Sequence, residues 1–203
     1  MGEHYYARRP SSAHRPGELS VRVRGLSLRL RTDTGVFSRG ELDRGTELLL
    51  EAFDPNPCAL ILDLGCGYGV LGLVAAKLSE GGHAILTDVN ERAASLARAN
   101  IRGNGIANAE VRVGNLYEPV RDLAFDHIVC NPPIRAGRAV VDRIVADAPA
   151  HLLNGGQLWL VARTRQGAET LQGRMREAFG NAQVVKRGSG YKVLRSTKGA
   201  KPS

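Results

Sequence analysis

Apolar and polar residues alternate near the start of the chain. Leucine or valine occupies every second position in residues 19–23 and again in residues 26–30, with serine or arginine between them. A period of two is typical of a strand with one buried face, and Gly25 separates the two runs, so we predict a β-hairpin over residues 18–31. Its apolar face packs on the body of the protein, and its opposite face presents four arginines: Arg22, Arg24, Arg29 and Arg31.

Apolar segments of two kinds follow one another along the rest of the chain. A helix is predicted from Leu42 to Phe53. After it, apolar runs of strand length alternate with segments whose apolar residues recur at helical spacing, which is typical of a doubly wound α/β sheet. The predicted strands are residues 60–63, 83–88, 111–113, 125–130, 156–163, 183–186 and 191–194, and the later helices include residues 91–104, 138–151 and a segment that passes Phe179.

A length of 203 residues suits a single domain. We predict that this domain covers residues 18–196, with its sheet in residues 58–196, between a flexible basic arm (residues 1–17) and a basic tail (residues 197–203). No apolar run approaches the ~18 residues that span a membrane, and the polar start does not resemble a secretory signal. The three cysteines are scattered without metal-ligand spacing, so we expect reduced thiols, no bound metal and a cytoplasmic protein.

Positive charge is concentrated towards the two ends of the chain. Residues 1–31 carry a net charge of +5 and residues 181–203 a net charge of +6, whereas the residues between them carry −3. Basic ends on a body of ordinary charge are expected of a protein with a polyanionic partner such as RNA. A solubilising surface with a disordered tail gives the same distribution, and the arginine face of the hairpin fits phosphate contacts and a solvated surface equally well.

The first candidate site follows the strand of residues 60–63. Asp63 ends the apolar run, and Gly65, Gly67 and Gly69 occupy alternate positions before a helical pattern begins. Glycines permit a tight turn here and let backbone N–H groups approach a ligand closely, as they do in dinucleotide-binding proteins. An acid at the mouth of the loop would repel a pyrophosphate, but it would attract the ammonium and sulfonium groups of S-adenosylmethionine. The charges therefore favour the sulfonium cofactor.

A second acid, Asp88, ends the strand of residues 83–88. It lies about twenty residues beyond the glycines, where a ribose-binding carboxylate is expected. Val89 then offers an apolar surface to adenine. The alternative role for this segment is helix capping by Asp88 or Asn90.

The third candidate site is the tetrapeptide Asn131-Pro132-Pro133-Ile134 after the strand of residues 125–130. Two prolines cannot continue the hydrogen-bond ladder, so the chain leaves the sheet in a stiff turn. The turn brings the Asn131 amide and the Pro132 carbonyl to the carboxyl edge of the sheet, where ligands of open α/β folds bind. Two acceptors there can hold both N–H groups of a planar amine. An ordinary turn after a strand is the alternative.

Together these motifs resemble those of a known family. Asp63-Leu64-Gly65-Cys66-Gly67-Tyr68-Gly69, Asp88-Val89-Asn90 and Asn131-Pro132-Pro133-Ile134 are similar to motifs of class I S-adenosylmethionine-dependent methyltransferases with a small methyltransferase domain. The similarity is greatest to guanine-N2 methyltransferases of small-subunit ribosomal RNA and their single-domain homologues. It implies a Rossmann-like, mostly parallel sheet whose last strand is antiparallel.

The resemblance also implies roles for individual residues. The tetrapeptide that begins at Asn131 carries the catalysis, and Phe37, Arg135 and Arg138 contact the substrate together with the hairpin arginines. Two positions depart from the wider pattern, because Ile134 cannot stack on a base as an aromatic residue would, and Asn115 takes the place of an aspartate. The cofactor pocket is expected to consist of Asp63, Gly65, Cys66, Gly67, Tyr68, Gly69, Asp88, Val89, Asn90, Asn115, Leu116 and Asn131.

The predicted function is methyl transfer from S-adenosylmethionine to an exocyclic amine of a nucleic-acid base, guanine N2 of ribosomal RNA above all. The expected partner is RNA or the small ribosomal subunit, with no membrane, and a monomer is favoured. Protein glutamine and adenine N6 remain alternative acceptors, because the same tetrapeptide serves all three. A cofactor-binding ribosome assembly factor with little turnover is a further alternative. Methyl transfer needs alignment more than a strong base, so none of the five histidines is assigned a role.

Overall fold

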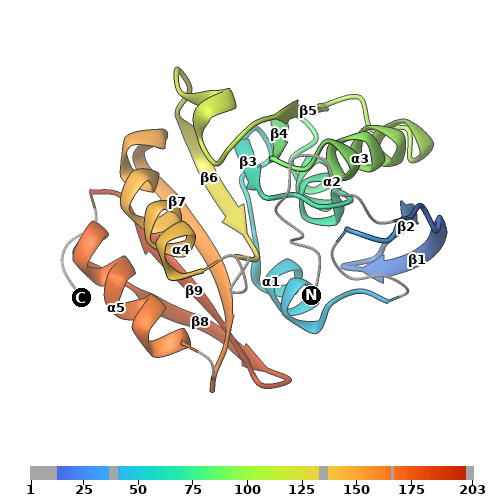
Figure 1. Cartoon of the computed structure of the whole chain (residues 1–203). Coiled ribbons are helices and arrows are strands. Elements are labelled where there is room, and N and C mark those ends of the chain that lie inside the picture. The colour runs from blue at the N-terminus through green and yellow to red at the C-terminus, as the bar shows by residue number, and fades with distance from the viewer. Residues whose placement is uncertain (1–12, 37–40, 133–136, 166, 200–203) are drawn as a thin grey trace.

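The computed structural model describes residues 13–36, 41–132, 137–165 and 167–199, and seven of its strands form one sheet (Figure 1). The strand order is β5-β4-β3-β6-β7-β9-β8. β9 runs antiparallel to both of its neighbours, while the other neighbouring strands are parallel, which confirms the predicted α/β class and the antiparallel last strand. The strands are β3 (Leu60–Leu64), β4 (His83–Asp88), β5 (Ala109–Val113), β6 (Phe125–Cys130), β7 (Leu152–Arg163), β8 (Gln183–Gly188) and β9 (Tyr191–Thr197).

Helices cover both faces of this sheet (Figure 1). Within the described part of the chain, none of them is long and apolar enough to cross a membrane. One face carries α1 (Arg44–Ala52), α2 (Val70–Leu78) and α3 (Glu91–Gly103), and the other carries α4 (Arg138–Asp147), α5 (Ala168–Phe179) and the 3-10 turns η1 (Glu118–Val120) and η3 (Ala148–His151).

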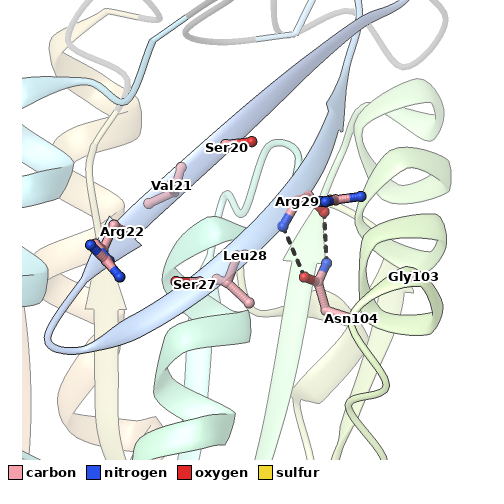
Figure 2. Close-up of a pocket in the computed structure, with 8 residues that line it drawn as sticks. All are labelled: Ser20, Val21, Arg22, Ser27, Leu28, Arg29, Gly103 and Asn104. Carbon is pink, nitrogen blue, oxygen red and sulfur yellow. Dashed lines mark hydrogen bonds between the residues drawn. The ribbon is translucent and has the colours of Figure 1, made fainter.

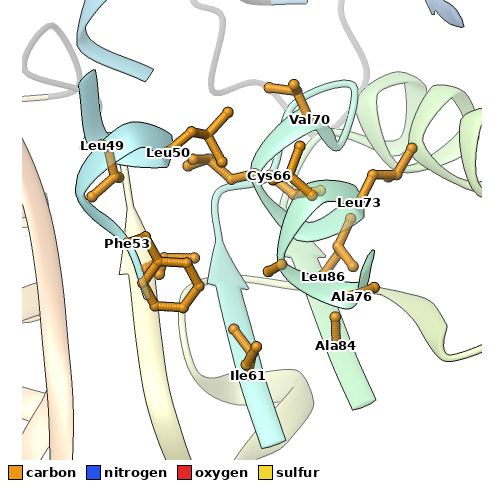
Figure 3. Close-up of a cluster of buried hydrophobic side chains, with 14 of the residues drawn as sticks. Leu49, Leu50, Phe53, Ile61, Cys66, Val70, Leu73, Ala76, Ala84 and Leu86 are labelled. Atoms are coloured by element: carbon orange, nitrogen blue, oxygen red, sulfur yellow. The ribbon is translucent and has the colours of Figure 1, made fainter. Parts of the chain in front are cut away.

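Two apolar cores lie on the two faces of the sheet. Successive residues of a strand point to opposite faces, so Ile61 of β3 packs in one core and its neighbour Leu62 in the other. In the first core, Phe53 packs edge-on against Trp159 with 5.5 Å between ring centroids. Figure 3 shows this core, in which side chains of α1 and α2 meet Ile61, Ala84 and Leu86 of the sheet. Both cores hold the carboxyl ends of the strands in fixed positions, and those ends carry the candidate site.

The predicted hairpin is confirmed as a separate two-stranded sheet of β1 (Gly17–Val23) and β2 (Leu26–Thr32). Arg24 and Gly25 form the turn, both with positive φ (+50° and +78°). Val21, Val23, Leu28 and Leu30 are buried against the body of the protein, whereas Ser20, Arg22, Ser27, Arg29 and Arg31 are exposed. The period of two in the sequence therefore predicted both the element and its buried face.

Residues on both sides of the range 18–196 make hydrogen bonds with it. His14 and Arg15, which precede β1, bond to Asp33 directly after β2: the His14 side chain lies 2.6 Å from Asp33 Oδ2, and the Arg15 N–H donates to Asp33 Oδ1 at 2.7 Å. At the other end, β9 continues to Thr197, and the Lys198 N–H donates to the Gly156 carbonyl at 2.9 Å. His14, Arg15 and Lys198 are thus bonded to residues of the hairpin segment and the sheet.

Candidate active site

The glycine loop between β3 and α2 is bonded to the end of β4. The N–H groups of Gly65 and Cys66 donate to the Thr87 carbonyl at 2.8 and 2.9 Å, and the Gly67 N–H donates to Asp88 Oδ2 at 2.8 Å. Gly65 and Gly67 have φ values of +76° and +58°, a conformation that residues with a side chain rarely adopt. The hydrogen bonds therefore join two of the three motifs predicted from the sequence into one unit.

The glycines of the loop differ in what surrounds them. A Cβ atom on Gly65 would meet no atom within 4 Å, so space is open on that side of the backbone. A Cβ atom on Gly72 would lie 2.4–2.7 Å from the Leu86 side chain. Gly72 therefore allows α2 to pack closely on β4, whereas Gly65 leaves room for a ligand.

Asp63 is fully buried directly before the loop. Its Oδ2 accepts a hydrogen bond from the Gly72 N–H at 2.8 Å, and its Oδ1 has no partner in the described residues. Burial raises the pKa of Asp63 to about 7, the nearby charge of Asp88 adds to this, and the bond from Gly72 acts in the opposite direction. An unpartnered carboxylate oxygen in this position fits a cationic donor such as the ammonium group of S-adenosylmethionine.

Asp88 is buried at the end of β4, and both of its oxygens accept backbone hydrogen bonds. Oδ1 accepts from the Asn90 N–H and Oδ2 from the Gly67 N–H, each at 2.8 Å. Burial raises the pKa of Asp88, against the effect of these bonds. A carboxylate offers about four acceptor positions, so these bonds leave Asp88 with acceptor capacity for a ribose hydroxyl.

Asn90 takes the capping role that the sequence left open between it and Asp88. Its Oδ1 accepts from the Arg92 and Ala93 N–H groups at 2.9 and 3.2 Å, and its Nδ2 donates to the Gly35 carbonyl at 3.1 Å. Asn90 therefore starts α3 and also fixes the loop that follows the hairpin. The predicted contact of Asn90 with the cofactor would therefore have to use atoms other than these side-chain atoms. Asp88 is not needed as a helix cap.

A third segment reaches the site after β5. The Gly114 N–H donates to the Asp88 carbonyl at 3.0 Å, so the turn that holds Asn115 and Leu116 begins beside Asp88. Leu116 has a φ of +48°, which is uncommon for a residue with a side chain and is found more often at functional sites. Asn115 is exposed at this turn.

Strand β6 places Asn131 at the same edge of the sheet. Asp63 pairs with Val129 in the parallel ladder of β3 and β6, so Asn131 lies two residues beyond the partner of Asp63. Its Nδ2 donates to Asp43 Oδ2 at 3.0 Å and to Thr46 Oγ1 at 2.9 Å. The motifs after β3, β4, β5 and β6 therefore lie next to one another at the carboxyl ends of adjacent strands.

Asp43 and Thr46 are site residues that the sequence analysis missed. Asp43 is the N-cap of α1, because its Oδ2 accepts from the Thr46 N–H at 2.9 Å. An acid three residues before a threonine at the start of an apolar helix signals a cap in the sequence. It does not signal a contact with Asn131, which is 88 residues away.

The other predicted site residues differ in how deeply they are buried. Pro132 is buried, Tyr68 is buried in the first core, Val89 is partly exposed, and Arg138 is exposed at the start of α4. Burial raises the pKa of the Cys66 thiol well above its usual value, so this thiol stays protonated. Phe37, Pro133, Ile134 and Arg135 lie outside the described residues.

The arginines of the hairpin do not all lie on one face. Arg24 is in the turn, and its guanidinium donates to the Phe53 carbonyl and pairs with Asp54 at 3.1 Å. It therefore fastens the hairpin to the end of α1. The arginine face consists of Arg22, Arg29 and Arg31, whose side chains have no ion pair within the described residues.

A shallow groove of about 300 Å³ lies along this face (Figure 2). The Asn104 side chain at its rim accepts from the Arg29 N–H at 3.0 Å and donates to the Arg29 carbonyl at 2.8 Å. Asn100, one turn earlier in α3, makes the corresponding pair of bonds to Arg31 at 2.7 and 3.0 Å. The groove is lined mainly by Ser20, Arg22, Ser27, Arg29 and Asn104.

Comparison with known proteins identifies relatives of the whole chain. Residues 27–195 match the model of the methyltransferase small domain family. The chain is 38% identical to the uncharacterized protein YbxB of Bacillus subtilis, over 98% of this chain and all of that protein. It is 35% identical to the ribosomal RNA small subunit methyltransferase C of Hamiltonella defensa, over 84% of this chain and 50% of that protein.

One solved structure is similar over most of the chain. The 16S rRNA N2 methyltransferase RsmC of T. thermophilus, in complex with AdoMet and guanosine, matches 90% of this chain with a TM-score of 0.80 and 30% sequence identity. The match covers 50% of that protein, so the chain spans about half the length of the small-subunit methyltransferases that it resembles.

Proposed function

The chain belongs to the methyltransferase small domain family, which makes S-adenosylmethionine its cofactor, and on this premise we propose that it methylates guanine N2 of ribosomal RNA. The observation that carries the proposal is the location of Asn131, whose amide lies at the carboxyl edge of the sheet beside the glycine loop. An amide in this position can hold the amine of a base next to the cofactor.

The described residues fit the proposed cofactor. The unpartnered Oδ1 of Asp63 suits the ammonium group, Asp88 suits the ribose, and Gly65 leaves open space beside the loop. S-adenosylmethionine supplies a methyl group on a positively charged sulfur. Asp63 would therefore hold the cofactor by charge, and Asp88 would hold it by hydrogen bonds.

The acceptor is held rather than deprotonated. The Asn131 Oδ1 and the Pro132 carbonyl accept the two N–H groups of the amine, which directs its lone pair towards the methyl carbon. The nitrogen–carbon bond forms as the carbon–sulfur bond breaks, the electron pair of that bond stays on sulfur, and the methylated amine loses a proton to water. Alignment of this kind contributes several kcal/mol to a displacement reaction, so the site needs no strong base.

The arginine face supports RNA as the substrate. Two arginines (Arg22 and Arg29), two serine hydroxyls and the Asn104 amide line one groove between the hairpin and the end of α3, and Arg31 is exposed on the same strand as Arg29. Guanidinium and hydroxyl groups bind phosphate oxygens without reading base sequence. The hairpin would therefore hold the RNA backbone while the tetrapeptide at Asn131 receives the base.

The proposal is tested by methylation of ribosomal RNA from cells that lack the gene. The purified protein and isotopically labelled S-adenosylmethionine are incubated with naked RNA and with small subunits, and the digested nucleosides are identified by mass spectrometry. We expect label in N2-methylguanosine. Label in N6-methyladenosine or in a protein glutamine would replace the proposed acceptor, and cofactor binding without transfer to either substrate would favour an assembly factor.

A further inference from the structure

We infer that Asp43 and Thr46 are positioning residues that turn the Asn131 amide so that only its oxygen faces the acceptor. This inference rests on the proposed function for its catalytic consequence. The Asn131 amino group donates to Asp43 Oδ2 at 3.0 Å and to Thr46 Oγ1 at 2.9 Å. No described residue donates a hydrogen bond to Asn131 Oδ1.

The chemistry of the two partners fixes which way the amide points. An ionised carboxylate only accepts hydrogen bonds, so the group 3.0 Å from Asp43 must be the amino group. The Thr46 hydroxyl lies 3.4 Å from the same carboxylate oxygen and donates its hydrogen there, so it meets Asn131 as an acceptor. A flipped amide would set its oxygen against the lone pairs of the Asp43 carboxylate.

This arrangement determines what can bind next to Asn131. An amide that presents only its oxygen accepts from an N–H group and repels a carbonyl oxygen. The carboxylate of Asp43 also polarises the amide, which strengthens its oxygen as an acceptor when positive charge develops on the amine. Asp43 and Thr46 therefore make the Asn131 site selective for an amine over an oxygen nucleophile without hydrogens. They also favour the transition state in which that amine is methylated.

The positioning pair is held by a packed helix. Asp43 caps α1, and Thr46 lies in the first turn with 4% of its surface exposed. Leu49 and Leu50 of the same helix are fully buried (Figure 3). A Cβ atom on Gly45 would lie 2.8 Å from the Tyr191 ring, so the first turn of α1 also packs closely against β9. The orientation of Asn131 is thus coupled to the position of α1 on the sheet.

The decisive variant is Asp43→Asn. Asparagine caps helices as well as aspartate does, so α1 should be retained. An asparagine at this position can either donate or accept, so it no longer forces the Asn131 amide into one orientation. We expect kcat for methyl transfer to fall about 10- to 100-fold, with cofactor affinity within about twofold of the unchanged protein.

Thr46 provides a matched pair of variants. Thr46→Val keeps the shape of the side chain and removes the hydroxyl, so kcat should fall. Thr46→Ser keeps the hydroxyl, so its kcat should stay close to that of the unchanged protein. KM for RNA should stay within about twofold in all three variants, because the RNA backbone is bound elsewhere. Unchanged kcat in both Asp43→Asn and Thr46→Val, with normal melting temperatures, would overturn the inference.

A measurement without substrate separates this inference from the proposed function. In ¹⁵N spectra, the side-chain amide of Asn131 is identified by its loss in Asn131→Ala. Its two hydrogens should exchange slowly with solvent in the unchanged protein and faster in Asp43→Asn. Fast exchange in the unchanged protein contradicts the orientation itself, whereas slow exchange in a protein that methylates no amine contradicts only the proposed function.

Discussion

At the scale of single residues, the ionised form of Asp63 is unfavourable in the cofactor-free protein, because the bond from the Gly72 N–H does not offset the cost of its burial. The carboxyl is fully buried with one oxygen unpartnered, and its pKa is raised to about 7 from the ordinary value of 3.8. The folded state therefore binds a proton between these two values that the unfolded state has lost. The free energy of unfolding of the cofactor-free protein should accordingly decrease, by an amount on the order of a few kcal/mol, as pH rises from about 4 to about 7.

Cofactor affinity should have the opposite dependence on pH. In the proposed site the ammonium group binds ionised Asp63, so cofactor affinity should rise up to about tenfold per pH unit as pH rises towards the pKa of about 7. It should fall again above about 8, where an α-amino group loses its proton. Calorimetry at several pH values measures this profile. Asp63→Asn should weaken binding and remove the acidic limb, and equal affinity of the unchanged protein at pH 5.5 and 7.5 would contradict the assigned contact.

Asp88→Ala should weaken cofactor binding by roughly 1–3 kcal/mol, because the ribose loses its acceptor and the Gly67 N–H loses its anchor. Asp126→Ala is the matched control, since Asp126 also accepts a backbone hydrogen bond, from the Leu60 N–H at 2.8 Å, but at the amino end of β6. Calorimetry with S-adenosylmethionine and with NADH compares the two. Tight NADH binding without affinity for the sulfonium cofactor would refute the assignment.

Asn131→Ala should leave cofactor affinity nearly unchanged while methyl transfer falls by about 10²-fold or more, because the amide serves the acceptor amine. Single-turnover measurements with saturating cofactor and RNA would give the rate of transfer directly. A variant that transfers at the normal rate would leave the tetrapeptide without the proposed role.

At the scale of elements, the hairpin is connected to the glycine loop through one side chain. The Asn100 amide of α3 donates to the Arg31 carbonyl at 3.0 Å and to the Tyr68 carbonyl at 2.8 Å. The first carbonyl belongs to β2 and the second to the loop between β3 and α2. The arginine face and the glycine loop therefore keep a fixed relation to each other, as the proposed RNA substrate would require.

Replacing Arg22, Arg29 and Arg31 together with glutamine should lower the slope of log affinity for RNA against log salt concentration by about 2–3 units, because each phosphate contact releases counterions. Arg24 is excluded from this set because it fastens the turn to Phe53 and Asp54. Salt titrations by fluorescence anisotropy measure the slope, and cofactor affinity should be unchanged.

The control for that variant removes the same charge elsewhere. Arg121, Arg143 and Arg176 are exposed on the other side of the sheet or at its rim, and their joint replacement with glutamine should leave the slope unchanged. If both triple variants lower the slope equally, the hairpin has no special role, and the basic segment from Lys186 onward becomes the better candidate.

Strands and helices were predicted correctly from the sequence where the local pattern of apolar residues determines them. The hairpin has a strict period of two, and β6 runs from Phe125 to Cys130 as expected. The start of β7 at Leu152 lies before the predicted strand, because Gly155 and Gly156 interrupt the apolar run. The register between β6 and β7 also shifts here, between Phe125 and His127. The contact of Asn131 with Asp43 and Thr46 was missed for another reason, since only the packing of α1 on the sheet brings these segments together.

At the scale of the whole molecule, the sheet order explains how three distant motifs form one site. β3, β4 and β6 are neighbours, so the segments that begin after Asp63, Asp88 and Cys130 leave the sheet side by side. A TM-score of 0.80 relates the chain to one half of a longer RsmC protein. Under the proposed function, the charged ends of the chain and the arginine face of the hairpin are the features that would bind the RNA.

The asparagines that hold β2 have a consequence for how copies of the protein behave at high concentration. The strand β2 pairs with β1 on one side, and on the other side its backbone is bonded by Asn100 and Asn104 at Arg29 and Arg31. An open strand edge is a template for a strand of another molecule and favours aggregation. The two amide side chains occupy that edge in the way a neighbouring strand would.

The double variant Asn100→Ala, Asn104→Ala should therefore associate more strongly than the unchanged protein as concentration rises, because four backbone groups of β2 lose their partners. Light scattering over a concentration series would detect it, and lysine in place of Ser27 on the same strand should reduce it by charge repulsion. Equal scattering from both proteins would mean that the edge is closed by something other than these two amides.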